Sequence, residues 1–184
     1  MTGYIILAVV VVIAIYAISL YNRLVTRRNE VKGSWRQIDV QLKRRYDLIP
    51  NLVETVKDSM AYEQETLTMV IEARNKAVSA QTPADTIKAD SQVTAAMGKL
   101  FAVMEAYPNL KAVDNVASLM GELSTTENQI AFTRQNYNDV VMSFNTAIQV
   151  FPANIVAGMF GFAIEPYFKV EEEAVREAPK VDLR

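Results

Sequence analysis

The chain has 184 residues, 51% of them hydrophobic, and a formal net charge of −2. This length suits one domain with an anchor. The small net charge provides no basic field for nucleic acid, so no nucleic-acid partner is expected. The sequence contains no cysteine and no histidine, which excludes disulfides, zinc sites built on those residues and imidazole acid–base chemistry.

The first element is an apolar run over residues 3–21 that carries no charge. A membrane-spanning helix needs about 20 apolar residues, and interfacial aromatics such as Tyr4 and Tyr21 commonly bracket a span. The run therefore predicts a transmembrane helix. The alternative is a cleaved signal peptide, which the small residues at 17–19 would suit. However, the first three residues, MTG, lack the Lys or Arg of a signal sequence.

Charge is distributed unevenly behind this helix. Residues 21–50 carry eight Lys or Arg against three Asp or Glu, whereas residues 51–164 carry seven against twelve. The basic residues nearest the span are Arg23, Arg27 and Arg28, and the positive-inside rule places their side in the cytoplasm. We therefore expect a single-pass protein with its N-terminus outside and the lipid bilayer as a partner. The arginines would also suit anionic headgroups, although setting the topology is the simpler interpretation.

Helical spacing of apolar residues persists through most of the remaining chain, and no stretch shows sustained strand-like alternation. The sequence predicts an all-α fold, in which the transmembrane helix continues into a long, antiparallel helical bundle with heptad-like seams. One seam runs from Val31 to Arg74 and another from Val113 to Phe151, each with spacings that alternate between three and four.

Two residues interrupt these seams without shifting their phase. Pro50 removes one helical hydrogen bond, so the helix either kinks there or ends, with Asp47 as the cap of a new helix. At Gly121 the alternatives are one helix or a break at a capping box in residues 124–127. Because the seams keep their phase, we favour a kink at Pro50 and one helix through Gly121.

Turn signals divide the rest of the bundle. Thr82 suits an N-cap with Pro83 in the first helical position, which predicts a helix from there to about Ala106. Pro108 then interrupts the pattern, and Asn109 is expected to cap the last long helix. We expect an up-down-up order of the long helices.

The chain is thereby divided into an anchor (residues 1–21), a cytoplasmic helical bundle (22–164) and a charged, flexible tail (165–184). Pro152 ends the last long helix. The apolar stretch 150–162 around it is larger than a loop requires. It would contact a neighbouring copy, dip into the membrane interface or fold back over its own bundle. The residues proposed for an oligomer contact are Met159, Phe160 and Phe162.

Five charged residues stand on lines that are otherwise apolar: Arg45, Glu63, Arg74, Glu127 and Arg134. Unpaired charges on a buried seam are costly, so ion pairs are expected, and equal helical rise brings Glu127 to the level of Arg74. A structural polar seam is the simpler interpretation, because Arg and Glu without histidine offer little catalytic chemistry. We therefore expect no catalytic residues, no cofactor, no metal site and no enzymatic activity.

The last long helix carries four asparagines, Asn128, Asn136, Asn138 and Asn145. Asparagine is a poor helix former, so some of these side chains are expected to hydrogen-bond across helices. A groove for a sugar or a peptide is the alternative.

Beyond the apolar span, the chain reads YNRLVTRRNEVKGSWRQIDVQLKRRYDLIPNLVETVKDSMAYEQETL, and further on AYPNLKA, GELSTTENQIAFTRQNYNDVVMSFNTAI and VFPANIVAGMFGF. These segments resemble the LemA family over nearly the whole chain apart from the tail. The resemblance implies a bacterial inner-membrane protein with a short outer terminus and a cytoplasmic all-α domain. It also implies no established enzymatic activity, and some members are associated with building magnetosome membranes.

Two functions fit these expectations. One is a self-assembling scaffold, a homo-oligomer that organises or remodels the membrane at its cytoplasmic face. The other is a monomeric or dimeric adaptor or regulator that binds another, unidentified protein and uses the acidic stretch EEEAVRE of the tail to recruit a basic partner.

Overall fold

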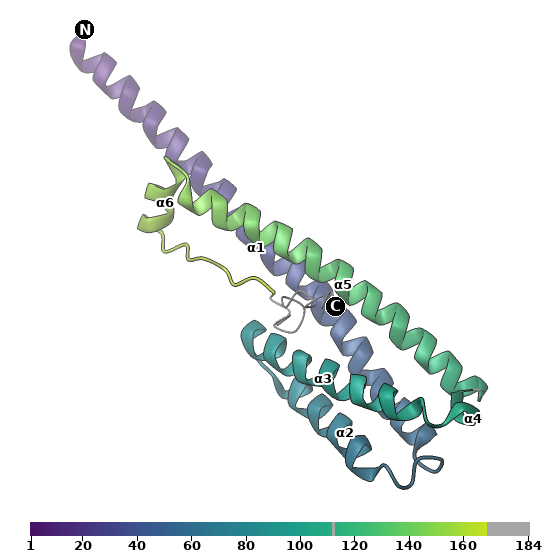
Figure 1. Ribbon diagram of the computed structural model, residues 1–184. Coiled ribbons are helices and arrows are strands. Elements are labelled where there is room, and N and C mark those ends of the chain that lie inside the picture. The colour runs from purple at the N-terminus through teal and green to yellow at the C-terminus, as the bar shows by residue number, and fades with distance from the viewer. Residues whose placement is uncertain (112, 169–184) are drawn as a thin grey trace, which may run out of the picture.

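The computed structural model describes residues 1–111 and 113–168, and these form helices joined by short turns (Figure 1). The helices are α1 (Thr2–Val56), α2 (Gln64–Ser79), α3 (Pro83–Met104), α4 (Pro108–Lys111), α5 (Asp114–Gln149) and α6 (Ala153–Met159). The predicted all-α fold, with an apolar N-terminal helix that continues into an antiparallel bundle, is confirmed.

Helix α1 continues without a break from the apolar N-terminal segment into the bundle (Figure 1). Its 55 residues form a rod of about 80 Å at 1.5 Å per residue. Pro50 lies inside this helix, so the alternative of a break capped by Asp47 is wrong. Helix α5 is also continuous through Gly121, which confirms the single helix that the seam phase favoured.

The first seam does not follow one helix as far as Arg74. Helix α1 ends at Val56, and a turn over residues 57–63 reverses the chain into α2. Helices α2 and α3 form a hairpin beside the C-terminal half of α1, and α5 returns antiparallel along α1 (Figure 1). The expected up-down-up order is therefore wrong, because the turn after Val56 adds one reversal of direction.

Helix α3 begins where the sequence predicts. Thr82 is its N-cap, Pro83 follows in the first turn, and the Thr82 hydroxyl oxygen accepts a hydrogen bond from the Asp85 backbone N–H at 3.1 Å. Asn109 does not cap the last long helix, because it lies inside the one-turn helix α4 and Val113 occupies the N-cap of α5.

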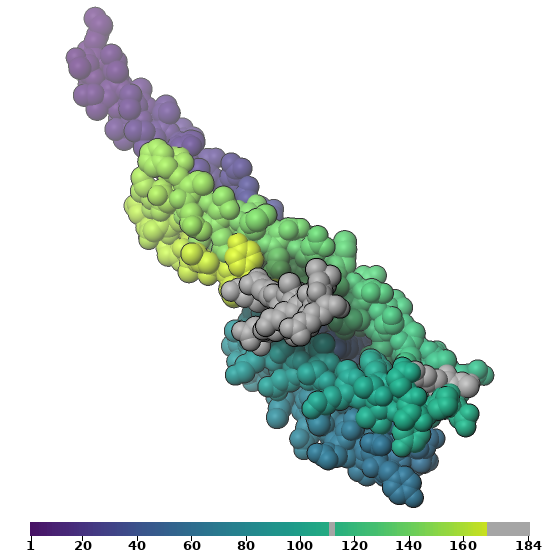
Figure 2. Space-filling model, viewed as in Figure 1, coloured from purple at the N-terminus to yellow at the C-terminus, as the bar shows by residue number. Residues whose placement is uncertain are grey.

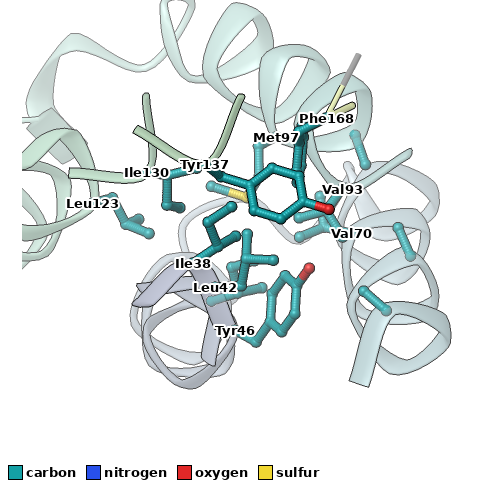
Figure 3. Close-up of a cluster of buried hydrophobic side chains, with 14 of the residues drawn as sticks. Ile38, Leu42, Tyr46, Val70, Val93, Met97, Leu123, Ile130, Tyr137 and Phe168 are labelled. Atoms are coloured by element: carbon teal, nitrogen blue, oxygen red, sulfur yellow. The ribbon is translucent and has the colours of Figure 1, made fainter. Parts of the chain in front are cut away.

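The core lies where α1 and α5 meet the α2–α3 hairpin (Figure 3). Ile38, Ile49, Val70 and Ile130 are fully buried within it. A buried aliphatic side chain of this kind contributes about 1.5–3 kcal/mol to stability. The core therefore fixes the register between α1, α5 and the hairpin, and through them the positions of the polar side chains described below.

Two further segments follow α5 and lie beside the bundle at its end nearer the N-terminus (Figure 1). We call residues 150–161 the corner; here the chain bends by 92° between α5 and α6. We call residues 162–168 the strap, which runs back along the rod from the corner without helical structure (Figures 1 and 2). Residues 165–168, which the sequence assigns to the tail, are part of the strap, and residues 169–184 lie outside the described residues.

Candidate functional site

The first part of α1 projects beyond the other helices (Figure 1). All of residues 2–16 are exposed, Tyr4 among them, and none of them is charged. The helix is long and apolar enough to cross a membrane, and an apolar helix without protein cover indicates membrane anchoring.

The corner packs against α1 where the projecting part ends. The Tyr21 ring lies 4.7 Å from the ring of Phe160 and 5.9 Å from that of Phe162, measured between centroids. Phe162 is half-buried, whereas Met159 and Phe160 keep 76% and 58% of their surface exposed. Of the residues proposed for an oligomer contact, Phe162 thus packs within the chain, Phe160 contacts Tyr21 but stays largely exposed, and Met159 is exposed.

The three arginines after the span lie around the corner and the end of α5. Arg27 donates to the Ser143 carbonyl oxygen at 3.0 Å and also contacts its hydroxyl. The Arg28 guanidinium lies 4.9 Å from the centroid of the Phe162 ring, an attractive cation–π geometry. Arg23 is exposed and lines a groove between α1 and the C-terminal end of α5.

A buried polar layer crosses the bundle where α1, α3 and α5 meet, and Asp90 of α3 is its centre. Arg45 of α1 donates to Asp90 Oδ1 at 3.3 Å, and Arg134 of α5 pairs with Asp90 Oδ2. The Tyr46 hydroxyl donates to Asp90 Oδ1 at 3.1 Å. Arg45 also pairs with Glu127 at 3.2 Å. The structure therefore brings three of the five predicted seam residues together: Arg45, Glu127 and Arg134.

The remaining two seam residues lie elsewhere. Arg74 donates to the Tyr46 carbonyl oxygen at 2.9 Å and pairs with Asp47 at 3.8 Å, so the predicted Glu127–Arg74 pair is wrong. The reason is the early end of α1, because α2 then packs against α1 and α3 while α5 packs along α1. Glu63 is the N-cap residue of α2 and accepts a hydrogen bond from the Tyr107 hydroxyl at 3.4 Å.

Asp90 is the functional residue that sequence reasoning missed. It is 1% exposed, and its signal was present in the sequence. Asp90 begins a line with alternating spacings of three and four along α3, whose other members are Val93, Met97, Leu100 and Met104. A carboxylate on such a line needs paired partners, and the two arginines supply them.

The polar layer is built to hold charges rather than to exchange protons. Burial, and then the Asp90 carboxylate, raise the pKa of Tyr46, so its hydroxyl stays protonated and donates. Asp90 already accepts from two arginines and one tyrosine. Among residues 1–111 and 113–168, no group of three or more acidic side chains is close enough to hold a metal ion. This arrangement fits the register-fixing interpretation of the polar seam.

Two of the four asparagines hold the strap against α5. The Asn138 side-chain amide donates to the Phe168 carbonyl oxygen at 3.1 Å and accepts from the Phe168 N–H at 2.8 Å. Asn145 makes the same pair of bonds with Glu165, both at 2.9 Å. The predicted hydrogen bonding thus occurs with an extended segment rather than with another helix. Asn128 and Asn136 are exposed.

The end of the strap is anchored in an aromatic pocket. Phe168 is 5% exposed, its ring is stacked at 6.2 Å from that of Trp35, and the Arg134 guanidinium lies 4.5 Å from its centroid. The Tyr137 hydroxyl donates to the Pro166 carbonyl oxygen at 3.0 Å. Burial, and then Glu165, raise the pKa of Tyr137 to about 12. Arg134 therefore joins the pocket to the polar layer.

Comparison with known proteins identifies the family to which this chain belongs. The LemA family model matches residues 34–183. The chain is 26% identical to magnetosome protein MamQ 1 of Paramagnetospirillum magneticum, covering 89% of this chain and 71% of that protein. It is 29% identical to protein LemA of Metamycoplasma hominis, covering 74% of this chain and 63% of that protein. Because the family match extends over most of the helical bundle and the strap, this chain belongs to the LemA family.

Proposed function

We propose that this protein is a non-enzymatic, membrane-anchored helical scaffold that self-assembles at the cytoplasmic face of a bacterial inner membrane and thereby organises or remodels that membrane. The observation that carries the proposal is the corner, an exposed apolar surface beside the end of the anchor helix. Its most exposed members are Phe151, Ile155, Met159 and Phe160.

The length of the projecting part of α1 determines how deep the corner lies relative to the membrane. Residues 2–16 are all exposed and extend for about 22 Å at 1.5 Å per residue. The hydrocarbon core of a bilayer is about 30 Å thick. A span across it therefore draws in the next turns of α1 as far as Tyr21, against which the corner packs. The corner then lies in the interfacial layer of the membrane.

The amino-acid composition around the corner agrees with a position in the interfacial layer of the membrane. From residue 140 to residue 164 the chain carries no charge, although this stretch includes the end of α5 and all of α6. On α1 the first charge after the span is Arg23. The arginines near the corner support a cytoplasmic position for the bundle, because the positive-inside rule assigns basic flanks to that side.

We infer self-assembly because every copy would hold its corner at the same depth in the membrane. Each anchor holds its corner at the same level, so the exposed faces of neighbouring copies lie in one plane. Contiguous exposed apolar surface of this kind marks an interaction site. Met159 and Phe160 supply the contact between copies, and Phe162 supports them from inside. The similarity to a magnetosome protein supports a membrane-associated role.

The test is the mass and shape of the full-length protein in mild detergent, measured by light scattering and particle imaging. The proposal expects a large, symmetric particle. The double variant M159S/F160S should reduce it to small species without loss of helicity. The matched control is Y62S/V78S, which removes exposed apolar side chains from the bundle away from the corner. A monomer or dimer before any substitution would overturn the scaffold and favour an adaptor.

A further inference from the structure

The face of α5 that carries Asn138 and Asn145 is built to hold an extended peptide. The two asparagines are seven residues apart, which is about 10.5 Å along a helix. The strap residues that they bind, Glu165 and Phe168, are three apart, which is about 10 Å in an extended chain. The two spacings match, so each side-chain amide donates to the C=O and accepts from the N–H of one strap residue.

These bonds reach the main chain of the strap and do not depend on its side chains. Selectivity comes instead from an aromatic residue at each end. Phe162 lies beside Tyr21 and under Arg28, and Phe168 lies beside Trp35 and under Arg134. Main-chain bonds between side-chain pockets are the usual means by which proteins recognise extended peptides.

We call the surface under the strap, with Asn138, Asn145 and the aromatic contacts at its two ends, the strap groove. We propose that the strap groove is a peptide-binding site for an extended segment with aromatic residues six positions apart, and that in the assembly it takes the strap of a neighbouring copy. The second half of this inference rests on the proposed self-assembly. The strap begins at the corner, which is the surface proposed to touch the neighbour. Because the anchors hold all copies at one depth, the strap groove of a neighbour lies at the same height as the departing strap.

The reach of the strap is sufficient for this exchange. An extended segment over residues 162–168 covers about 20 Å, and packed helices lie about 8–10 Å apart. Gly161 at the start of the strap has a φ of +68°, a conformation that glycine adopts without strain. The bonds to the two asparagines are the same whichever copy supplies the strap. Exchange of an identical segment is therefore a low-cost route to assembly.

The strap groove itself is tested with a synthetic peptide of residues 161–168, capped at both ends. Trp35 is the sole tryptophan and lines the Phe168 pocket, so its fluorescence reports occupancy. In full-length F168A protein, whose own strap has lost its anchor, the peptide should bind saturably. Adding N138A/N145A should weaken binding at least tenfold, whereas the control N128A/N136A should leave it unchanged. Absent binding, or equal binding by both double variants, would overturn the peptide site.

The exchange is tested by cross-linking two differently tagged full-length chains in membranes. The chain has no cysteine of its own, so one copy carries D139C and the other Y167C, at exposed positions next to Asn138 and Phe168 that leave both of those residues in place. A short thiol-reactive cross-linker should join the two tags. A third chain that carries both cysteines reports whether the strap binds within its own chain. If the cross-link forms within one chain but never between the two tagged chains, while the particle keeps its mass, the exchange is overturned and the scaffold proposal is unaffected. If the protein forms no large particle at all, both the scaffold and the strap exchange are overturned. The peptide titration then still tests whether the surface under the strap binds a peptide.

Discussion

Arg74 supplies the hydrogen bond that Pro50 removes from α1. A proline has no N–H to donate to the carbonyl four residues earlier, which here belongs to Tyr46. The Arg74 Nε on α2 donates to that carbonyl oxygen at 2.9 Å. A helix can therefore continue through the proline because the next helix satisfies the freed acceptor, and the same bond fixes how the hairpin docks on α1.

Replacing Arg74 with alanine should lower the free energy of unfolding by about 1–3 kcal/mol, since a half-buried carbonyl loses its partner. Its ion pair with Asp47, which is 63% exposed, contributes little. The decisive measurement is a double-mutant cycle with P50A, which restores an N–H to the helix. The R74A substitution should cost clearly less in the P50A background. An equal cost in both backgrounds would show that the two residues are not coupled.

Asp90 should be the most sensitive position of the polar layer. Its removal leaves two buried guanidinium groups without their shared carboxylate, at a cost of about 3–5 kcal/mol. We expect D90N to lower the denaturation midpoint strongly in chemical unfolding followed by circular dichroism. The control is D139N, an exposed carboxylate on α5, which should change stability by less than about 0.5 kcal/mol. Comparable effects from the two variants would contradict the role of Asp90.

Stability should fall as pH rises above about 10, the ordinary pKa of tyrosine. Burial raises the pKa of Tyr46, and it raises that of Tyr137 from 10.0 to about 12. Between the two values the unfolded chain loses a proton that the folded chain keeps, so the free energy of unfolding decreases with pH. Unfolding curves between pH 9 and 11.5 should show a shallower decline for Y137F. The exposed control Y62F should retain the full slope, and an unchanged slope in Y137F would contradict the assignment.

The depth of the corner can be measured because the chain lacks cysteine. An environment-sensitive fluorophore on F160C, in protein reconstituted in vesicles, should emit as in an apolar layer and be quenched by lipids brominated along their acyl chains. The same label on Y62C, in the turn between α1 and α2, should remain in water and escape quenching. Quenching at neither position would place the corner above the membrane and leave contact with a neighbouring copy as its cover.

The sequence by itself determined the helical class, the anchor and the continuity of α5, because each depends on local spacing and hydropathy. It also pointed to four asparagines on the last long helix as candidates for hydrogen bonding, but it did not distinguish Asn138 and Asn145, which bind the strap, from Asn128 and Asn136, which are exposed. Local rules could not detect the end of α1 at Val56, because the seam keeps its phase through the turn at residues 57–63.

Tertiary structure decided which charges meet. Glu127 pairs with Arg45 rather than Arg74 because the additional reversal after Val56 places α2 and α5 in different positions around α1. Asp90 became the centre of the layer because α3 packs beside both arginines. Likewise, Glu165 and Phe168, which bond with Asn145 and Asn138, belong to residues that the sequence assigns to the tail. Periodicity reports which face of a helix is buried, and only the packing of the chain determines what that face contacts.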